Sequence, residues 1–463
     1  MSENGSKAKS HGIDGDSASS RPQGDPHTTS PARVIGEPSK IKDTSKRRRS
    51  NFPEEINDAR WKSRDRHFFI LSSAGKPIYS RYGDEVKLSS LMASMQGIIS
   101  LFADVEDSIR STSFGDHKIV FLLKDNLYFI AASRVDNSEI VIREQLNYMY
   151  YQIVSIINNT NLRAIFGERP NADLRRYLEG SEHVLDHLVD CLDTDLCFSL
   201  GSLDVMNVKY SLREHIGKTL LEKRPKGLLY AIVASGMKLI TILRPRKHSL
   251  HPIDLHLIFS MVNSSRTFNA PETCVPICLP RFNDKRFLNV YVSFIVPKVA
   301  LILVYPARDS FQIMSEYRNN VTERLKTDGS MQRLSDLASI PPLSPDQMEI
   351  PGLLQFYYKS KEHLVYETPC ETLFNAVWNP RRITRCYRNI RVMMLSTALE
   401  PHKICHQVNE EEVILGWNTS AFELYAAFSP NTDTKSITNG ANSIIQWIRR
   451  ERDQLFVIHS PSF

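Results

Sequence analysis

The chain has 463 residues, 41% of them hydrophobic and 24% charged, so it is long enough for about two to four globular domains. Its formal charge is +6, but the first fifty residues carry ten Lys and Arg against six Asp and Glu, which leaves +2 for the remaining 413. A basic surface extending over the whole fold, as expected of a nucleic-acid-binding protein, is therefore not indicated.

Secretion and membrane insertion are disfavoured by the same sequence. No apolar run approaches the roughly 20 residues that a membrane span requires, and the N-terminus has no apolar signal core. Seven cysteines are few for this length, and an odd number argues against a framework of disulfides. We therefore expect a soluble, cytoplasmic chain.

Residues 1–60 are predicted to form a disordered regulatory arm. Ser, Gly, Pro, Lys and Asp dominate this segment, and large apolar residues are almost absent, so it cannot bury enough surface to offset the entropy of ordering. It contains a basic run of Lys46, Arg47, Arg48 and Arg49. Three interpretations stay open for this run: a solvated linker, attachment to an anionic membrane at about 1 kcal/mol per basic residue, or a nuclear signal.

The first ordered unit is predicted from residue 61 to residue 200. Short apolar strands at 67–71 and 77–82 flank turn residues at 74–76. A helix follows, because apolar residues recur at spacings of three and four. These residues are Leu88, Leu91, Met92, Met95, Ile98, Ile99, Phe102 and Val105. Such a stripe is more typical of a core than of a binding surface.

The unit continues with three strands and a second amphipathic helix. The strands at 118–123 and 127–133 are apolar at nearly every position, which predicts a sheet covered on both faces. The second helix carries a stripe that begins at Ile142 and ends at Ile157, and residues 171–192 supply one more helix. The result is a five-stranded antiparallel sheet between helices, the longin topology.

The same order of elements recurs twice. The second unit is predicted at 226–330 and the third at 351–463, with linkers near 200–225 and 326–350. In the third unit we expect a helix near 371–378 and strands within 354–358, 363–366, 387–394, 412–417 and 421–428. The fold class is therefore α/β (α+β), with three longin-like domains that follow a disordered arm.

No catalytic constellation is evident, since the sequence has no P-loop, no dinucleotide-binding glycine fingerprint and no Gly-x-Ser-x-Gly elbow. Three groups of residues were weighed as metal sites and are better explained as structure. Cys274 and Cys278 are expected to be core or edge cysteines; the group of His402, Cys405 and His406, in an expected loop, has no evident fourth ligand. His183 and His187, beside Asp186 and Asp190, are expected on a solvated helix face.

The segment 67–83, HFFILSSAGKPIYSRYG, resembles the opening hairpin of the SAND family of endosomal and vacuolar trafficking proteins. Residues 127–133, LYFIAAS, and 146–153, LNYMYYQI, are similar to the strand and helix that follow in that family. Further resemblance runs through 171–178 and 227–245, and in all it covers about residues 61–463.

The resemblance implies a subunit of a guanine-nucleotide exchange factor and no cofactor. In this family the Mon subunit forms a heterodimer with Ccz, which is also built from longin domains. The dimer is recruited to endosomes by the early-endosomal Rab and by phosphoinositides, and it loads the late-endosomal Rab with GTP. Conversion of one Rab to the other then leads to lysosomal, vacuolar and autophagosome fusion. A non-enzymatic trafficking adaptor or tether is the alternative, because longin domains also occur in coat and SNARE proteins.

By this resemblance we expect the first longin domain to contribute to the Rab-binding and dimer platform. Ser90, Ser94 and Gln96 lie between the core positions of the first helix, and Lys76 and Tyr79 lie in the hairpin. These five residues are the predicted contacts with the GTPase. For Lys76 and Tyr79, turn chemistry and packing are the competing explanation.

Overall fold

The fold is described from a computed structural model. It describes residues 59–83, 87–103, 107–134, 138–264, 271–307, 310–337, 348–361, 368–370, 380–395 and 402–463. Residues 1–58 of the predicted arm, with the basic run Lys46, Arg47, Arg48 and Arg49, lie outside this range, as does Val105. Among the described residues, no helix combines the length and the apolar character needed to cross a bilayer.

Three five-stranded antiparallel sheets follow one another along the chain, and their strand orders are equivalent. In each sheet an opening hairpin supplies the first two strands, and the first strand pairs with the last one at the centre. The orders are β2-β1-β5-β4-β3, β7-β6-β10-β9-β8 and β12-β11-β15-β14-β13. The predicted threefold recurrence of an α+β unit, with a five-stranded sheet between helices, is confirmed.

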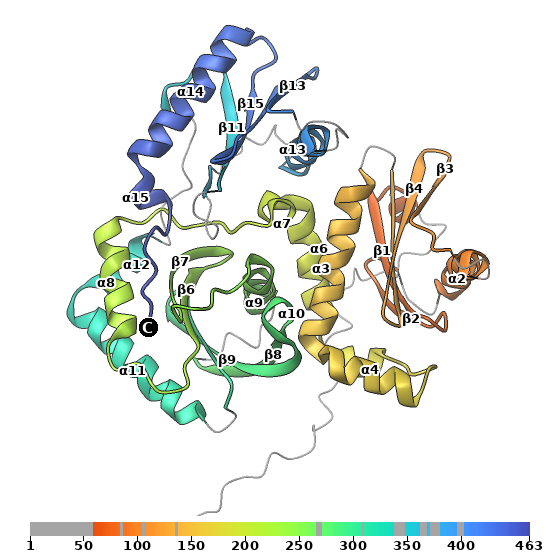
Figure 1. Ribbon diagram of the computed structural model, residues 1–463, viewed down its shortest axis with the longest axis horizontal. Helices are drawn as coiled ribbons and strands as arrows, with labels where there is room; N and C mark the ends of the chain where they lie inside the picture. Colours follow the sequence, from red (N-terminus) through yellow and green to blue (C-terminus); the bar gives the residue numbers. More distant parts are fainter. Residues whose placement is uncertain are drawn as a thin grey trace, which may run out of the picture. The chain divides into compact units, whose positions relative to one another are not determined.

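The first sheet is covered by one helix on each face. Its elements are β1 (Arg66–Ser72), β2 (Pro77–Ser80), α2 (Ser89–Ala103), β3 (Ser111–Phe114), β4 (His117–Lys124), β5 (Leu127–Arg134) and α3 (Glu139–Ile157). Phe69 and Leu71 of β1 lie in the core beneath α2, whereas Phe68 and Ile70 lie in the core beneath α3. Successive strand residues point to opposite faces, so a strand that is apolar throughout requires cover on both sides. Figure 1 shows α2 and α3 on opposite sides of this sheet.

Short helices lie before and after this unit. They are α1 (Ala59–Lys62), α4 (Asn159–Glu168), α5 (Arg175–Leu178), α6 (Glu182–Thr194) and α7 (Leu196–Leu200). The single helix predicted at 171–192 is therefore divided into α5 and α6. Gly180, between them, has a φ of 82°, a left-handed conformation that a continuous helix cannot contain.

The second sheet is covered by helices of its own unit and by helices from the two segments predicted as linkers. Its elements are β6 (Tyr230–Ser235), β7 (Lys238–Leu243), α9 (Pro252–Ser264), β8 (Thr273–Leu279), α10 (Pro280–Asn283), β9 (Asp284–Val296), β10 (Val299–Tyr305) and α11 (Phe311–Thr327). Helices α8 (Tyr210–Leu221) and α12 (Ser330–Leu337) lie within the segments predicted as linkers. Ile216 of α8 and Leu334 of α12 are buried in the same core as Val321 of α11, so both helices belong to this domain.

The third sheet departs most from the sequence prediction. Its elements are β11 (Leu353–Ser360), β12 (Thr368–Cys370), α13 (Pro380–Leu395), β13 (Ile404–Val408), β14 (Val413–Asn418), β15 (Phe422–Phe428), α14 (Thr434–Arg450) and α15 (Arg452–Leu455). The strand predicted within 387–394 is wrong: Tyr387, Ile390 and Met394 are buried at helical spacings of three and four, and they belong to α13. The strand predicted at 363–366 and the helix predicted at 371–378 fall outside the described residues.

Buried polar contacts join the described parts of the three domains. The Tyr148 hydroxyl of α3 lies 3.1 Å from Nδ1 of His256 in α9. The fully buried guanidinium of Arg388 in α13 donates to Oγ of Ser199 at 2.7 Å and to the Leu192 carbonyl. Because helices α3 and α6 contact both α9 and α13, elements of the first domain cover the corresponding helices of the other two domains.

The last residues of the chain lie against the second domain. The Arg244 amide donates to the Pro461 carbonyl at 3.1 Å, and the Phe463 amide donates to the Arg244 carbonyl at 3.2 Å. Arg213 of α8 donates to the carbonyls of Asp453, Gln454 and Phe456, so its guanidinium attaches the segment after α14 to the second domain. Burial lowers the pKa of Arg213 to about 10.

Candidate functional site

Helix α2 contains no charged residue along its 15 positions. Met92, Met95 and Ile99 face the sheet and are buried. The exposed positions are Ser89, Ser90, Ala93, Ser94, Gly97, Ser100, Leu101 and Phe102. Outer helix faces in globular proteins usually carry charged and polar residues. The outer face of α2 carries small residues along most of its length and apolar residues in its last turn, which is unusual for a surface that contacts only water.

Three exposed apolar residues lie on the α2 side of the first sheet. Leu101 is 69% exposed and Phe102 is 38% exposed, both in the last turn of α2. Phe114, at the end of β3, is 81% exposed. Phe114 pairs with His117, and residues of β4 with the same parity as His117, such as Phe121, belong to the core beneath α2. Phe114 therefore projects to the face of the sheet that α2 covers.

We call Ser90, Ser94, Gly97, Leu101 and Phe114 the α2–β3 surface. The strand within it, β3, is an edge strand, because among the described strands it pairs only with β4. Unpaired N–H and C=O groups along such an edge are available for pairing with another chain. The α2–β3 surface therefore combines a helix face of small residues, which another molecule could approach closely, with apolar side chains and a strand edge.

Gly97 has no packing explanation within the described part of the chain. A Cβ atom built at this position would meet no atom within 4 Å. Glycine inside a helix is less favourable than alanine by about 1 kcal/mol. The absence of a side chain at Gly97 thus weakens the helix without relieving any contact in this chain, and it would permit close approach of another molecule.

Comparison of the three domains shows what the helix in this position does elsewhere. Helices α9 and α13 occupy the same topological place in their own sheets as α2 does in the first. The outer sides of α9 and α13 contact α3 and α6. His256 on α9 and Arg388 on α13 make buried hydrogen bonds to these first-domain segments. The outer positions of α2 are instead exposed in the described part of the chain.

The predicted contacts on α2 divide into two groups. Ser90 and Ser94 are exposed on the outer face, where the Ser94 hydroxyl donates to the Ser90 carbonyl at 3.0 Å. Gln96 is half-buried and turns toward the hairpin, where Nε2 donates to the Ser73 carbonyl at 3.1 Å. Its side chain helps to hold the 72–76 turn and is directed away from the α2–β3 surface.

The two predicted contacts in the hairpin, Lys76 and Tyr79, make hydrogen bonds within the chain. Tyr79 is only 1% exposed, and its hydroxyl donates to Oδ1 of Asp186 at 2.6 Å. The burial of Tyr79 favours packing, the competing explanation for this residue, because α6 covers the side chain. Lys76 is exposed, and its Nζ donates to the Asn171 carbonyl.

The acidic face of α6 is only partly the solvated face that was expected: His183 is exposed, whereas Asp186, His187 and Asp190 are partly buried by packing. Arg81 lies 3.1 Å from Asp186 and 2.9 Å from Asp190, and Arg66 lies 3.0 Å from Asp193. Nδ1 of His187 lies 3.2 Å from the Ser260 hydroxyl of α9, and burial lowers the pKa of His187. These carboxylates neutralise the arginines of the opening hairpin.

The other residues weighed as metal ligands also have structural positions. Cys278 is buried, and burial raises its pKa to about 12; Sγ of Cys274 lies 3.2 Å from the Tyr305 hydroxyl. Cys405 and His406 are adjacent on β13, not in a loop as expected, so their side chains point to opposite faces of the sheet. Within the described residues, no group of three or more His, Cys, Asp or Glu is arranged to hold a metal ion.

Sequence reasoning missed the apolar part of the α2–β3 surface. It placed Phe102 in the core stripe and gave no role to Gly97, Leu101 or Phe114. The signals that pointed there were the absence of charge along residues 89–103 and the unexplained glycine in the middle of a helix.

Three family models match the chain in succession. They are described as the first, second and third longin domains of FUZ, MON1 and HPS1, and they match residues 66–188, 226–323 and 352–452. Among solved structures, a bacteriophytochrome from R. palustris aligns with 83% of the chain, but its TM-score of 0.15 and identity of 7% carry no argument about the fold.

Full-length relatives are similar over most of the chain. The vacuolar fusion protein MON1 homolog A of Gallus gallus is 34% identical over 89% of this chain and 75% of its own length. Protein SAND of Takifugu rubripes is 34% identical over 88% of this chain and 78% of its own length. The vacuolar fusion protein MON1 of Cryptococcus neoformans is 33% identical over 86% of this chain, which spans 65% of that relative.

Proposed function

The chain belongs to the MON1 and SAND family of longin-domain vacuolar fusion proteins, and from this premise we propose that it is one subunit of a heterodimeric guanine-nucleotide exchange factor. Its role lies in the trafficking that leads to vacuolar fusion. Its substrate is the late-endosomal or vacuolar Rab GTPase, and its partner is a longin-domain subunit of the Ccz type. Loading of this Rab converts early endosomes to late ones, and fusion with lysosomes, vacuoles and autophagosomes follows.

Such a factor needs no covalent catalysis. It binds the nucleotide-free GTPase more tightly than the loaded one, so nucleotide and Mg²⁺ dissociate by mass action, and the shift cannot exceed that difference in affinity. The switch loops of a GTPase are ordered by the γ-phosphate and Mg²⁺, so they can be held in another arrangement once these are gone. What the factor must supply is a rigid surface that fits the emptied GTPase.

The observation that carries the proposal is the uncovered outer face of α2. Helices α9 and α13 in the equivalent positions are packed against α3 and α6, whereas the outer positions of α2 are exposed among the described residues. We assign the α2–β3 surface to the platform that this chain forms jointly with its partner, with Ser90, Ser94 and Gly97 toward the GTPase. Leu101 and Phe114 provide the apolar area at its border.

Gly97→Ala tests this assignment, because it should raise the stability of the chain and lower its exchange activity. The added methyl group would meet no described atom within 4 Å, so the free energy of unfolding of the variant should be higher by up to about 1 kcal/mol. It should also slow release of a fluorescent nucleotide from the late-endosomal Rab, measured with the partner present, because the helix face is less open to close approach.

Gly167→Ala in α4 is the matched control. Gly167 is also an exposed helical glycine whose Cβ would meet nothing within 4 Å. It should gain stability in the same way and leave nucleotide release unchanged.

Three outcomes would contradict the assignment or the function. If the Rab releases nucleotide with Gly97→Ala at the same rate as with the wild type, the assignment of the surface is wrong. If subunit assembly falls in equal measure, the surface is the subunit interface. If the wild-type pair binds the Rab without accelerating release, the adaptor or tether function replaces exchange.

We further propose that the chain is recruited peripherally to endosomal, lysosomal or vacuolar membranes by the early-endosomal Rab and by phosphoinositides. Lys46, Arg47, Arg48 and Arg49 supply an electrostatic component, because basic residues near an anionic surface contribute about 1 kcal/mol each and are screened by salt. Deletion of residues 1–50 should weaken binding to anionic liposomes more than exchange in solution. Liposome binding that stays constant across a salt series would reject the electrostatic component.

A further inference from the structure

A cavity of about 860 Å³ lies where segments of the second and third domains meet. It is bounded by Gly201 and Ser202 after α7, by residues 247–252 before α9, by residues 281–283 of α10 and by residues 359–361 at the end of β11. None of these segments belongs to the α2–β3 surface. The cavity is therefore a separate feature of the chain.

The lining of this cavity is cationic and contains no carboxylate. Four of the lining side chains carry a positive charge, and two more are histidines: Lys247, Arg281, Lys359, Lys361, His248 and His251. Like charges around one cavity repel each other, so the arrangement is favourable only when water, salt or a bound anion compensates the charge.

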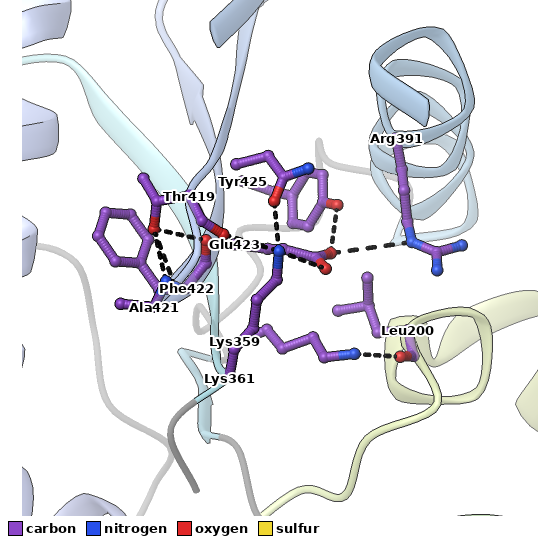
Figure 2. Close-up of polar contacts among 10 residues, drawn as sticks. Leu200, Lys359, Lys361, Arg391, Thr419, Ala421, Phe422, Glu423 and Tyr425 are labelled. Carbon is purple, nitrogen blue, oxygen red and sulfur yellow. Dashed lines mark hydrogen bonds and ion pairs between the residues drawn. The ribbon is translucent and has the colours of Figure 1, made fainter. Parts of the chain in front are cut away.

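One of the four cations is neutralised within the chain. Figure 2 shows Lys361 directed toward Glu423, and its Nζ lies 3.5 Å from Oε1 of that residue. It also donates to Oδ1 of Asn418 at 2.5 Å and to the Thr419 carbonyl at 2.8 Å. Lys361 therefore serves mainly to hold the turn between β14 and β15, and its charge is partly compensated.

The other three cations form no ion pair with a described carboxylate, although the charge of Arg281 acts to lower the pKa of the nearby Asp254 carboxyl. Nζ of Lys359 donates to the uncharged Leu200 carbonyl at 2.6 Å, as Figure 2 also shows. Lys247 and Arg281 are exposed. In the described part of the chain, no carboxylate lies within ion-pair distance of Lys247, Arg281 or Lys359.

Two further features favour an anion. Pro252, at the first position of the 13-residue helix α9, lines the cavity, so the positive end of the helix dipole lies at its border. Ser202 also lines the cavity, and its buried hydroxyl has no hydrogen-bond partner among the described residues. Asp254, in the first turn of α9, opposes this in part; it is buried outside the lining, accepts from the Arg281 amide at 3.0 Å, and burial raises its pKa to about 6, which reduces its negative charge.

We propose that this cavity binds a small anion bearing more than one phosphate group. Several separated cations and a volume well above that of one phosphate suit a multiply charged ligand better than a single inorganic ion. The same chemistry is offered by a soluble inositol polyphosphate and by a phosphorylated lipid headgroup. Only the lipid case rests on the membrane recruitment proposed above; the site itself does not depend on exchange activity.

The test measures binding to the whole chain without partner or GTPase. Inositol hexakisphosphate and inorganic pyrophosphate are titrated calorimetrically into the wild type and into the double variant Lys247→Glu with Arg281→Glu. Both side chains are exposed, and no ion pair holds either of them among the described residues, so the variant should fold; its melting temperature, measured beside that of the wild type, checks this. Its affinity for inositol hexakisphosphate should fall by about tenfold or more, because two attractive charges become repulsive.

The matched control is Lys226→Glu with Arg333→Glu, which changes the net charge equally at two exposed positions outside the cavity. It should keep the wild-type affinity. Equal weakening in both variants, or no binding by the wild type, overturns the site. Flotation with phosphatidylcholine vesicles, with and without a phosphatidylinositol monophosphate, then identifies the source: vesicle binding lost only in the cavity variant supports a headgroup, and its retention supports the soluble ligand.

Discussion

His256 should make the contact between α3 and α9 sensitive to pH. Its ring is fully buried, stacks on Phe198 with centroids 4.1 Å apart, and lies 3.1 Å from the Tyr148 hydroxyl. Burial lowers the pKa of His256 to about 3, although a hydrogen bond with the Ser202 backbone acts in the opposite direction. The folded chain therefore keeps this imidazole neutral throughout the physiological range.

The sign of the effect follows from the two pKa values. In the unfolded segment the histidine takes up a proton near its ordinary pKa of about 6.5, whereas the folded one takes it up only near 3. Stability is thus fully present above about pH 6.5 and decreases as the pH falls toward 3. Between pH 7 and pH 5 the loss from this one residue is about 2 kcal/mol.

His256→Phe isolates this contribution. Phenylalanine keeps the stacking on Phe198 but leaves the Tyr148 hydroxyl without its partner, which costs about 1–3 kcal/mol at either pH. The opening free energy of α9 is read from hydrogen exchange of its amides at both pH values. Wild-type protection should fall by roughly 30-fold more than that of the variant between pH 7 and pH 5.

Tyr148→Phe is the control, because it removes the same hydrogen bond and retains His256. It should lose stability at both pH values and keep the wild-type pH dependence. Burial raises the pKa of Asp254 to about 6, so its contribution to stability changes with pH in the opposite direction over this range. Asp254 is present in all three proteins, and its contribution cancels in the comparison. Parallel pH profiles for wild type and His256→Phe would refute the reasoning.

Two further substitutions test packing against function. Tyr79→Phe should lower the free energy of unfolding by about 1.5–3 kcal/mol, since it removes a hydrogen bond to the Asp186 carboxylate; nucleotide release by the assembled pair should be unchanged, and slower release would restore Tyr79 as a contact. Gly440→Ala should lower the unfolding free energy by about 1–3 kcal/mol, because its Cβ would lie 2.9 Å from both Ile350 and Phe428. Urea unfolding of this variant beside Gly97→Ala should show opposite signs, and a shared sign would mean that the packing around one of the glycines has been misjudged.

Local periodicity accounts for what could be predicted. The apolar strand 127–133 required cover on both faces, and β5 has it. The third domain was predicted less well because its signals conflict. Residues 387–394 include Ile390, Val392 and Met393, which suit a strand, but the burial of Tyr387, Ile390 and Met394 on one face shows that tertiary packing selects a helix. β13 was missed because its burial pattern leaves Ile404 and Val408 exposed, so it lacks the signature of a buried strand.

The candidate site was predicted only in part. Ser90 and Ser94 could be placed on the outer face of α2 by counting positions from the core stripe, and they lie there. Tyr79 could not be placed, because its burial depends on α6, more than a hundred residues later in the chain. Phe102 has the spacing of a core residue, but its side chain, in the last turn of α2, is 38% exposed.

The amino-acid sequence by itself determined which faces of each helix and strand are apolar, and therefore the number of sheets and the order of their elements. Only the tertiary structure decided what covers each face. Helices α2, α9 and α13 hold equivalent positions, but α3 and α6 pack on α9 and α13, whereas the outer positions of α2 are exposed among the described residues. The reason is physical: periodicity reports that a side chain avoids water, whereas the identity of its neighbour is settled by contacts between segments far apart in the chain.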